Sequence, residues 1–101
     1  MKKIKVTIWN EFLHERGEGK VADTIRKFYP DGIHAYLKEA LAADDLEIRA
    51  VSLDQPAQGL PDELLNDTDV LMWWGHVAHD KVCDELVAKI AERVRYGMGL
   101  I

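Results

Sequence analysis

Apolar runs along the chain predict three β-strands and the start of a fourth. Residues 4–9 are rich in β-branched and aromatic side chains, as is typical of a strand. Charged and apolar residues alternate in residues 46–53, which indicates a strand at the edge of a sheet. Residues 69–74 are almost continuously apolar, so we expect this strand inside the sheet with both faces covered. Residues 98–101 have the pattern of a fourth strand that is just beginning.

The segments between the strands carry apolar residues at helical spacing. Val21, Ile25 and Phe28 predict a short helix, and residues 62–65 add a helical turn. Two longer stripes predict two further helices, and the second stripe leads to Gly97, a residue type that commonly ends helices. The two stripes are formed by Ile33, Tyr36, Leu37, Ala40 and Leu41, and by Val82, Leu86, Val87, Ile90 and Val94.

This alternation of strands and helices predicts an α/β fold with a parallel sheet. We expect a flavodoxin-like three-layer sandwich with strand order 2-1-3-4, so that the first and third strands are neighbours. Residues 1–101 form a single domain in this interpretation. Because a doubly wound sheet usually has about five or more strands, we expect the fold to be incomplete in this chain, which would then be the N-terminal part of a longer domain. The open edge beside the fourth strand favours association into a homo-oligomer.

Composition and charge narrow the classes of partner. The chain has 18 acidic and 13 basic residues, for a formal net charge of −5. Nucleic acids and anionic membranes attract basic surfaces, so both partners are disfavoured. No apolar stretch has the length of a secretory signal or a membrane span. The single cysteine, Cys83, cannot form an internal disulfide, which favours a cytoplasmic location, and its place in the last helical stripe predicts a packed thiol.

Polar residues follow the first and third strands, at the edge where parallel sheets bind their ligands. The first of these loops carries Asn10, Glu11, His14, Glu15 and Arg16. The second loop carries Gly75, His76, His79 and Asp80. If the two strands are neighbours, these loops face each other across one crevice.

His76 and His79 have the spacing His-x-x-His, which directs two imidazoles toward one point if the turn is helical. With His14 or Glu11 as a third ligand, they predict a site for a divalent metal such as zinc. Hydrogen bonding to a polar ligand and proton transfer are alternative roles for the same histidines. A structural role is a further alternative, since His79 or Asp80 at a helix start caps free backbone N–H groups. No glycine-rich phosphate loop is present in the sequence, so no nucleotide cofactor is expected.

Trp9, Trp73 and Trp74 lie at strand ends, where an aromatic ring serves either the core or a ligand. Core packing is the favoured interpretation, because consecutive residues of a strand point to opposite faces and both faces are expected to carry helices. Trp74 and the adjacent Gly75 remain candidate contacts for a ligand. His34 lies beside the apolar stripe of its helix and is expected at the surface or its boundary.

Four segments together resemble the ThuA-like (trehalose-utilisation) family. They are Val-Thr-Ile-Trp-Asn-Glu-Phe (6–12), Tyr-Pro-Asp-Gly-Ile-His (29–34), Asp-Val-Leu-Met-Trp-Trp-Gly-His-Val-Ala-His-Asp (69–80) and Gly-Met-Gly-Leu-Ile (97–101). The resemblance implies a flavodoxin-like fold related to class I glutamine amidotransferases and a role in sugar utilisation. Members of the family are usually much longer, so it also implies that these 101 residues alone lack activity. Cys83 does not match the position of the amidotransferase nucleophile, which disfavours glutamine amidotransfer.

The resemblance also assigns roles to the two polar loops. The implied catalytic residues and metal ligands are His14, His76 and His79. The implied substrate contacts are Asn10, Glu11, Trp74, Gly75 and Asp80. The implied function is that of an enzyme acting on a sugar or an oxidised sugar derivative. A non-catalytic sugar-binding or accessory protein that uses the same crevice is the alternative.

Overall fold

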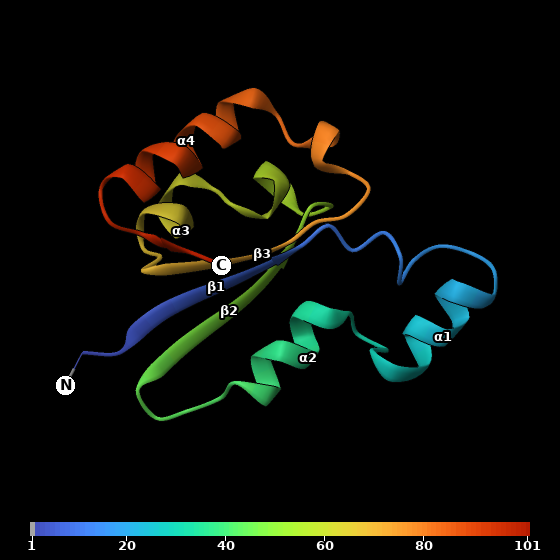
Figure 1. Ribbon diagram of the computed structural model, residues 1–101. Coiled ribbons are helices and arrows are strands. Elements are labelled where there is room, and N and C mark those ends of the chain that lie inside the picture. The colour runs from blue at the N-terminus through green and yellow to red at the C-terminus, as the bar shows by residue number, and fades with distance from the viewer. Residues whose placement is uncertain (1) are drawn as a thin grey trace.

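The computed structural model describes residues 2–101 and shows a parallel sheet between two layers of helices (Figure 1). Its four strands lie in the order β2-β1-β3-β4, and every neighbouring pair is parallel. The strands are β1 (Ile4–Asn10), β2 (Leu46–Ser52), β3 (Val70–Trp74) and β4 (Gly99–Leu100). The predicted α/β class, the three layers and the order 2-1-3-4 are confirmed, and the arrangement is flavodoxin-like.

Strand β1 lies inside the sheet, and its apolar and small polar side chains suit a strand that is buried on both faces. It is buried from Val6 to Asn10 and is paired with β2 on one side and β3 on the other. Strand β2 lies at the edge and β3 lies between β1 and β4, as the alternating and the continuous apolar patterns predict. The carboxyl ends of β1 and β3 therefore meet at the same edge of the sheet.

Helices cover the two faces of the sheet unequally. On one face α2 (Ile33–Ala40) packs against β1 and β2, while α1 (Lys20–Phe28) lies beyond it, past the strand ends (Figure 1). The other face is covered by α3 (Asp62–Asn66) and α4 (Asp84–Arg95). Short 3₁₀ turns at Pro56–Gly59 and His79–Lys81 lead into this second layer.

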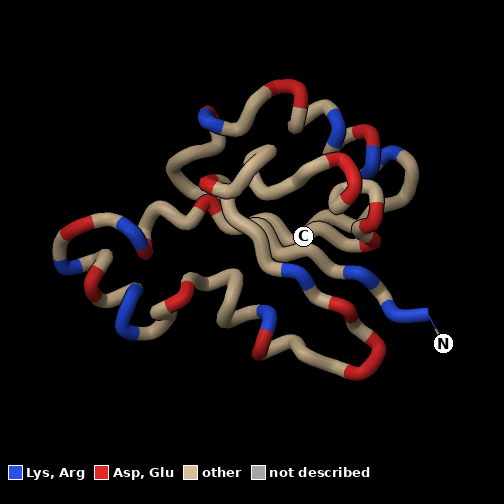
Figure 2. Tube along the Cα trace, turned by 180° about the vertical axis from the view of Figure 1, so that it is seen from behind, with Lys and Arg blue, Asp and Glu red and all other residues tan. Residues whose placement is uncertain are grey.

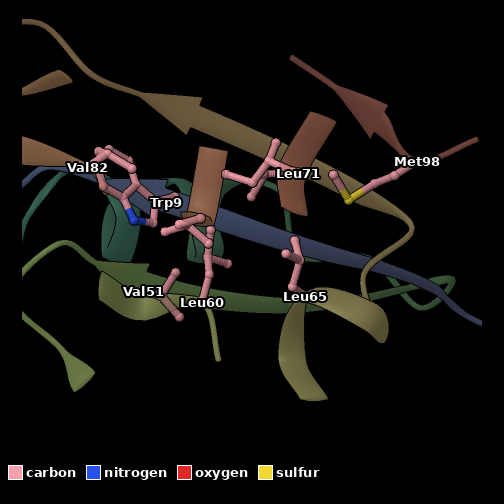
Figure 3. Close-up of a cluster of buried hydrophobic side chains, with 9 residues drawn as sticks. Trp9, Val51, Leu60, Leu65, Leu71, Val82 and Met98 are labelled. Carbon is pink, nitrogen blue, oxygen red and sulfur yellow. The ribbon is translucent and has the colours of Figure 1, made fainter. Parts of the chain in front are cut away.

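The main core lies between the sheet and the α3–α4 layer (Figure 3). Trp9 at its centre is completely buried and stacks on Trp73, with ring centroids 3.7 Å apart and an interplanar angle of 6°. The Trp9 Nε1 group donates a hydrogen bond of 2.8 Å to the carbonyl oxygen of Gln58, so the buried indole has no unpaired donor. Core packing is therefore confirmed for Trp9. The buried members of this core are Trp9, Val51, Leu60, Leu65, Leu71, Val82, Leu86, Ile90 and Met98.

The last helix begins later than its apolar stripe predicts. It starts at Asp84, and Cys83 precedes it in an extended conformation. Val82 lies in this extended segment, outside the helix, and its side chain is buried in the core. Because it is apolar and falls at helical spacing from Leu86, it matched the predicted stripe. The prediction that Cys83 is a packed thiol is wrong, because the residue lies outside the helix and is exposed.

Lys and Arg positions are interspersed among Asp and Glu positions on the helices and their connections, whereas residues 70–79 and 96–101 carry no charged residue (Figure 2). Among residues 2–101, none of the helices has both the length and the apolar character needed to cross a membrane.

Candidate functional site

The loops that follow β1 and β3 lie side by side. Asn10 and Trp74 are register partners at the ends of the two strands. The next residue, Glu11, donates its backbone N–H to the carbonyl oxygen of Trp74 at 3.1 Å. The predicted juxtaposition of the two polar loops is thus present in the structure.

Glu11 ties the two loops together through its side chain. Its carboxylate is buried, with only 1% of the residue exposed, and accepts hydrogen bonds from three consecutive backbone N–H groups. The distances from Glu11 Oε1 are 2.6 Å to the nitrogen of His76, 3.1 Å to that of Val77 and 3.2 Å to that of Ala78. Burial alone raises the pKa of Glu11, but these backbone donors outweigh it and hold the pKa below its ordinary value. The predicted substrate contact is thus a structural anchor for the loop that carries His76.

Three aromatic rings from the two loops gather at the mouth of the crevice: those of His14, Trp74 and His76, which we call the ring cluster. The ring centroids of His14 and His76 are 5.4 Å apart. The Trp74 ring lies 5.8 Å from His14 and 6.0 Å from His76, with tilted or edge-on geometry. His76 is exposed and the other two are half-buried, so a ligand has access to all three.

His79 lies apart from this cluster. Its ring stacks on Trp73 at 6.4 Å with an interplanar angle of 17°. Trp73 and Trp74 are consecutive residues of β3 and point to opposite faces of the sheet, so the partner of His79 belongs to the α3–α4 side. A side chain at position 75 would collide with the His79 ring, which explains the glycine there. Of the three predicted histidines, the fold brings two together.

The second loop also differs from the predicted helix start. His76 precedes the 3₁₀ turn that begins at His79, and α4 begins only at Asp84. Asp80 is exposed within that turn and does not cap α4. The His-x-x-His spacing therefore does not place both imidazoles on one helical face.

Within residues 2–101 no group of three or more His, Cys, Asp or Glu side chains is arranged to hold a metal ion. His14 and His76 supply two imidazoles, while the nearby Glu11 carboxylate is engaged by backbone amides.

A buried polar network lies beneath the ring cluster. The side chain of Asn10 donates from Nδ2 to Glu15 Oε2 at 2.7 Å and lies 3.1 Å from His34 Nδ1. Its Oδ1 accepts the backbone N–H of Phe12 at 2.9 Å, which holds Phe12 in a left-handed conformation with φ 59°. Asn10 therefore uses both Nδ2 hydrogens and one acceptor position of Oδ1 inside the protein, which gives it a structural role, and its contact with a ligand stays a prediction.

His34 is the buried histidine of this network, with 8% of the residue exposed, so the prediction of a surface position is wrong. Burial lowers the pKa of His34 despite the opposing carboxylates of Glu15 and Asp54, and the neutral imidazole accepts the Asn10 hydrogen bond through Nδ1. A side chain at Gly32, whose φ is +95°, would overlap the His34 ring. His34 escaped prediction because its burial comes from the β1 loop and not from its helical stripe.

Neither a protein-family model nor a curated protein matches this chain. The chemistry of the site therefore carries the functional conclusion.

A cavity of about 110 Å³ adjoins the ring cluster on the α1–α2 side of the sheet. It shares His14 and Trp74 with the ring cluster, while His76 is not one of its lining residues. Glu15 contributes the only carboxylate of its wall. The lining residues are Asn10, His14, Glu15, Ile25, Tyr29, Ile33 and Trp74.

Proposed function

We propose that the crevice binds a sugar or an oxidised sugar derivative and that His14 and His76 transfer protons to and from its oxygen atoms. The observation that carries this proposal is the ring cluster, in which two imidazoles flank an accessible indole at the carboxyl ends of β1 and β3. Ligands of open parallel sheets bind at this edge.

The composition of the ring cluster supports a carbohydrate. A half-buried indole offers a flat apolar surface to the C–H face of a sugar ring, and imidazoles donate hydrogen bonds to hydroxyls or accept them. The resemblance of the loop sequences to ThuA-like proteins points to the same class of ligand.

Two neighbouring imidazoles also support acid–base chemistry. An imidazole ring nitrogen either accepts or donates a proton, so two neighbouring rings supply a base and an acid to one ligand. The centroid separation of 5.4 Å lets both rings approach the same ligand oxygen. Glu11 holds His76 in this position through the backbone of the loop.

Calorimetry and product analysis test this function with trehalose and its oxidised derivatives. We expect saturable binding that His14→Ala and His76→Ala each weaken by about tenfold or more, because each removes a ligand contact. His79→Ala is the matched control, since the His79 ring stacks on Trp73 outside the cluster, and it should bind as the unmodified protein does.

Three results would decide between the alternatives. Saturable binding without product would assign sugar binding through the ring cluster, and no turnover, to these 101 residues, as the resemblance implies for the chain alone. Turnover that requires added zinc would favour the metal site predicted from the sequence, with a further ligand joining the two imidazoles. Absence of binding, or binding that depends on His79 and not on His76, would refute the proposal.

A further inference from the structure

Glu15 is a buried carboxylate with one oxygen engaged and one oxygen open. Only 6% of the residue is exposed. Oε2 accepts a hydrogen bond from Asn10 Nδ2 at 2.7 Å and another from the backbone nitrogen of Ile33 at 3.0 Å. Within residues 2–101, Oε1 accepts none, and the carboxylate makes no ion pair.

The open oxygen of Glu15 faces space that a ligand can enter. Among the described residues, Arg49 Nε is the one side-chain polar atom that has neither contact with solvent nor a hydrogen-bond partner. Glu15 Oε1 also lacks a partner, so it must retain some contact with solvent. Glu15 is one of the residues that line the cavity beside the ring cluster, and most of that lining is apolar. A buried acceptor without a donor costs free energy, which a donor from a ligand would recover.

The other residues of the cavity wall determine the size and polarity of the group that fits inside. Four of its residues present aliphatic or aromatic surface, namely Ile25, Tyr29, Ile33 and Trp74. The Asn10 side chain has no donor to spare, because both hydrogens of its Nδ2 are used inside the protein. A cavity of about 150 Å³ accommodates benzene, so a volume of about 110 Å³ fits a group of about four non-hydrogen atoms.

We infer that this cavity is the part of the proposed sugar site that receives a hydroxyl-bearing arm of the ligand, and that Glu15 Oε1 accepts the hydrogen of that hydroxyl. The inference rests on the proposed function and adds a specificity-determining residue to it. A carboxylate accepts hydrogen bonds and donates none, so it favours a hydroxyl over a hydrogen or an ether at that position of the sugar. The apolar walls contact the carbon atoms that carry the hydroxyl.

Binding of trehalose analogues to the 101-residue chain tests the inference. Each analogue has one hydroxyl of a glucose unit replaced by hydrogen, and each is measured by calorimetry against the unmodified chain and against Glu15→Gln. In Glu15→Gln the amide oxygen retains the Asn10 and Ile33 contacts, while its NH₂ group replaces the open acceptor with a donor. One analogue should bind the unmodified chain about ten- to a hundredfold more weakly than trehalose, because a hydrogen bond to a charged group is lost. In Glu15→Gln, the difference between the same analogue and trehalose should shrink to several-fold, since the NH₂ group donates a neutral hydrogen bond to the hydroxyl oxygen in place of the bond to a charged acceptor.

The outcomes separate this inference from the proposed function. Binding that His76→Ala weakens, combined with equal losses for every analogue in the unmodified chain and in Glu15→Gln, overturns the role of Glu15 alone. Binding that His76→Ala leaves unchanged overturns the proposed function and the inference with it.

A second variant keeps the test valid if Glu15→Gln does not fold. Ile25→Phe fills the cavity from α1 and leaves Glu15 itself unchanged, and we expect it to weaken trehalose binding about tenfold or more. Val21→Phe is the matched control, because Val21 lies on the same helix, is 70% exposed and does not line this cavity. Equal binding by Ile25→Phe and the unmodified chain would overturn the inference.

Discussion

The two faces of the sheet use neighbouring tryptophans of β3 in opposite ways. On the α3–α4 face, Trp73 stacks on the completely buried Trp9 and closes the core. On the α1–α2 face, Trp74 borders a cavity and two accessible imidazoles. Since consecutive strand residues point to opposite faces, a single step along the chain separates a residue that closes the core from one that borders a cavity.

Two buried carboxylates of one loop show the same contrast on a smaller scale. Glu11 and Glu15 are exposed to 1% and 6%, so burial does not distinguish them. Glu11 uses both oxygens on backbone amides and serves the structure, whereas Glu15 uses one and leaves the other open. The hydrogen bonds that a buried group lacks therefore indicate its role better than its burial does.

The largest expected effect separates the two faces through their tryptophans. Trp9→Ala should lower the free energy of unfolding by about 3–5 kcal/mol, because it leaves a cavity in the closed core. Trp74→Ala should lower it clearly less, because Trp74 is half-buried, while abolishing sugar binding. Urea denaturation followed by circular dichroism, with calorimetry of the folded variants, measures both. Equal losses of stability would show that the two faces are packed alike.

An intermediate effect is expected at Glu11, which separates anchoring from ligand binding. Glu11→Ala leaves three backbone N–H groups without their acceptor, so the free energy of unfolding should fall by about 2–3 kcal/mol. Hydrogen exchange of the amides of His76, Val77 and Ala78 should become faster.

Glu11→Gln provides the control for that experiment, because its amide oxygen still accepts N–H groups without the charge. Its stability and its amide protection should lie between those of Glu11→Ala and the unmodified chain. Unchanged protection of the three amides in Glu11→Ala would show that the carboxylate does not hold the loop.

The smallest expected effect is a dependence of stability on pH that originates at His34. Burial holds the pKa of His34 below its ordinary value in the folded chain, whereas the unfolded chain titrates near about 6.5. As the pH falls below that value, the unfolded state binds a proton at His34 before the folded state does. The free energy of unfolding should therefore decrease as the pH falls, until the lower folded-state pKa is reached. His34→Gln should reduce the slope in this range, and urea denaturation at a series of pH values measures it. An identical slope in both proteins would assign the effect to other groups.

The regular patterns of the chain predicted the sheet well, and the loops less well. The continuous apolar run before Trp74 and the alternation around Ile48 placed β3 inside the sheet and β2 at its edge, because strand burial repeats along the sequence. The start of α4 and the exposure of Cys83 were missed, because an extended segment buries Val82 at a position that fits the helical stripe. The burial of His34 was not predicted, because the residues that bury it belong to a loop that is distant in the sequence.

The sequence by itself determined the order of the elements and the parallel sheet, since these follow from apolar periodicity and from the alternation of strands and helices. The meeting of the first and third strands was expected only from a flavodoxin-like strand order, which the structure confirmed. Only the tertiary structure decided which polar residues of the two loops share a surface. It joined His14 to His76, assigned His79 to the other face and left one oxygen of Glu15 open. The reason is that irregular backbone has no period, so the direction of a loop side chain is set by hydrogen bonds to residues far away in the sequence, such as those that Glu11 accepts.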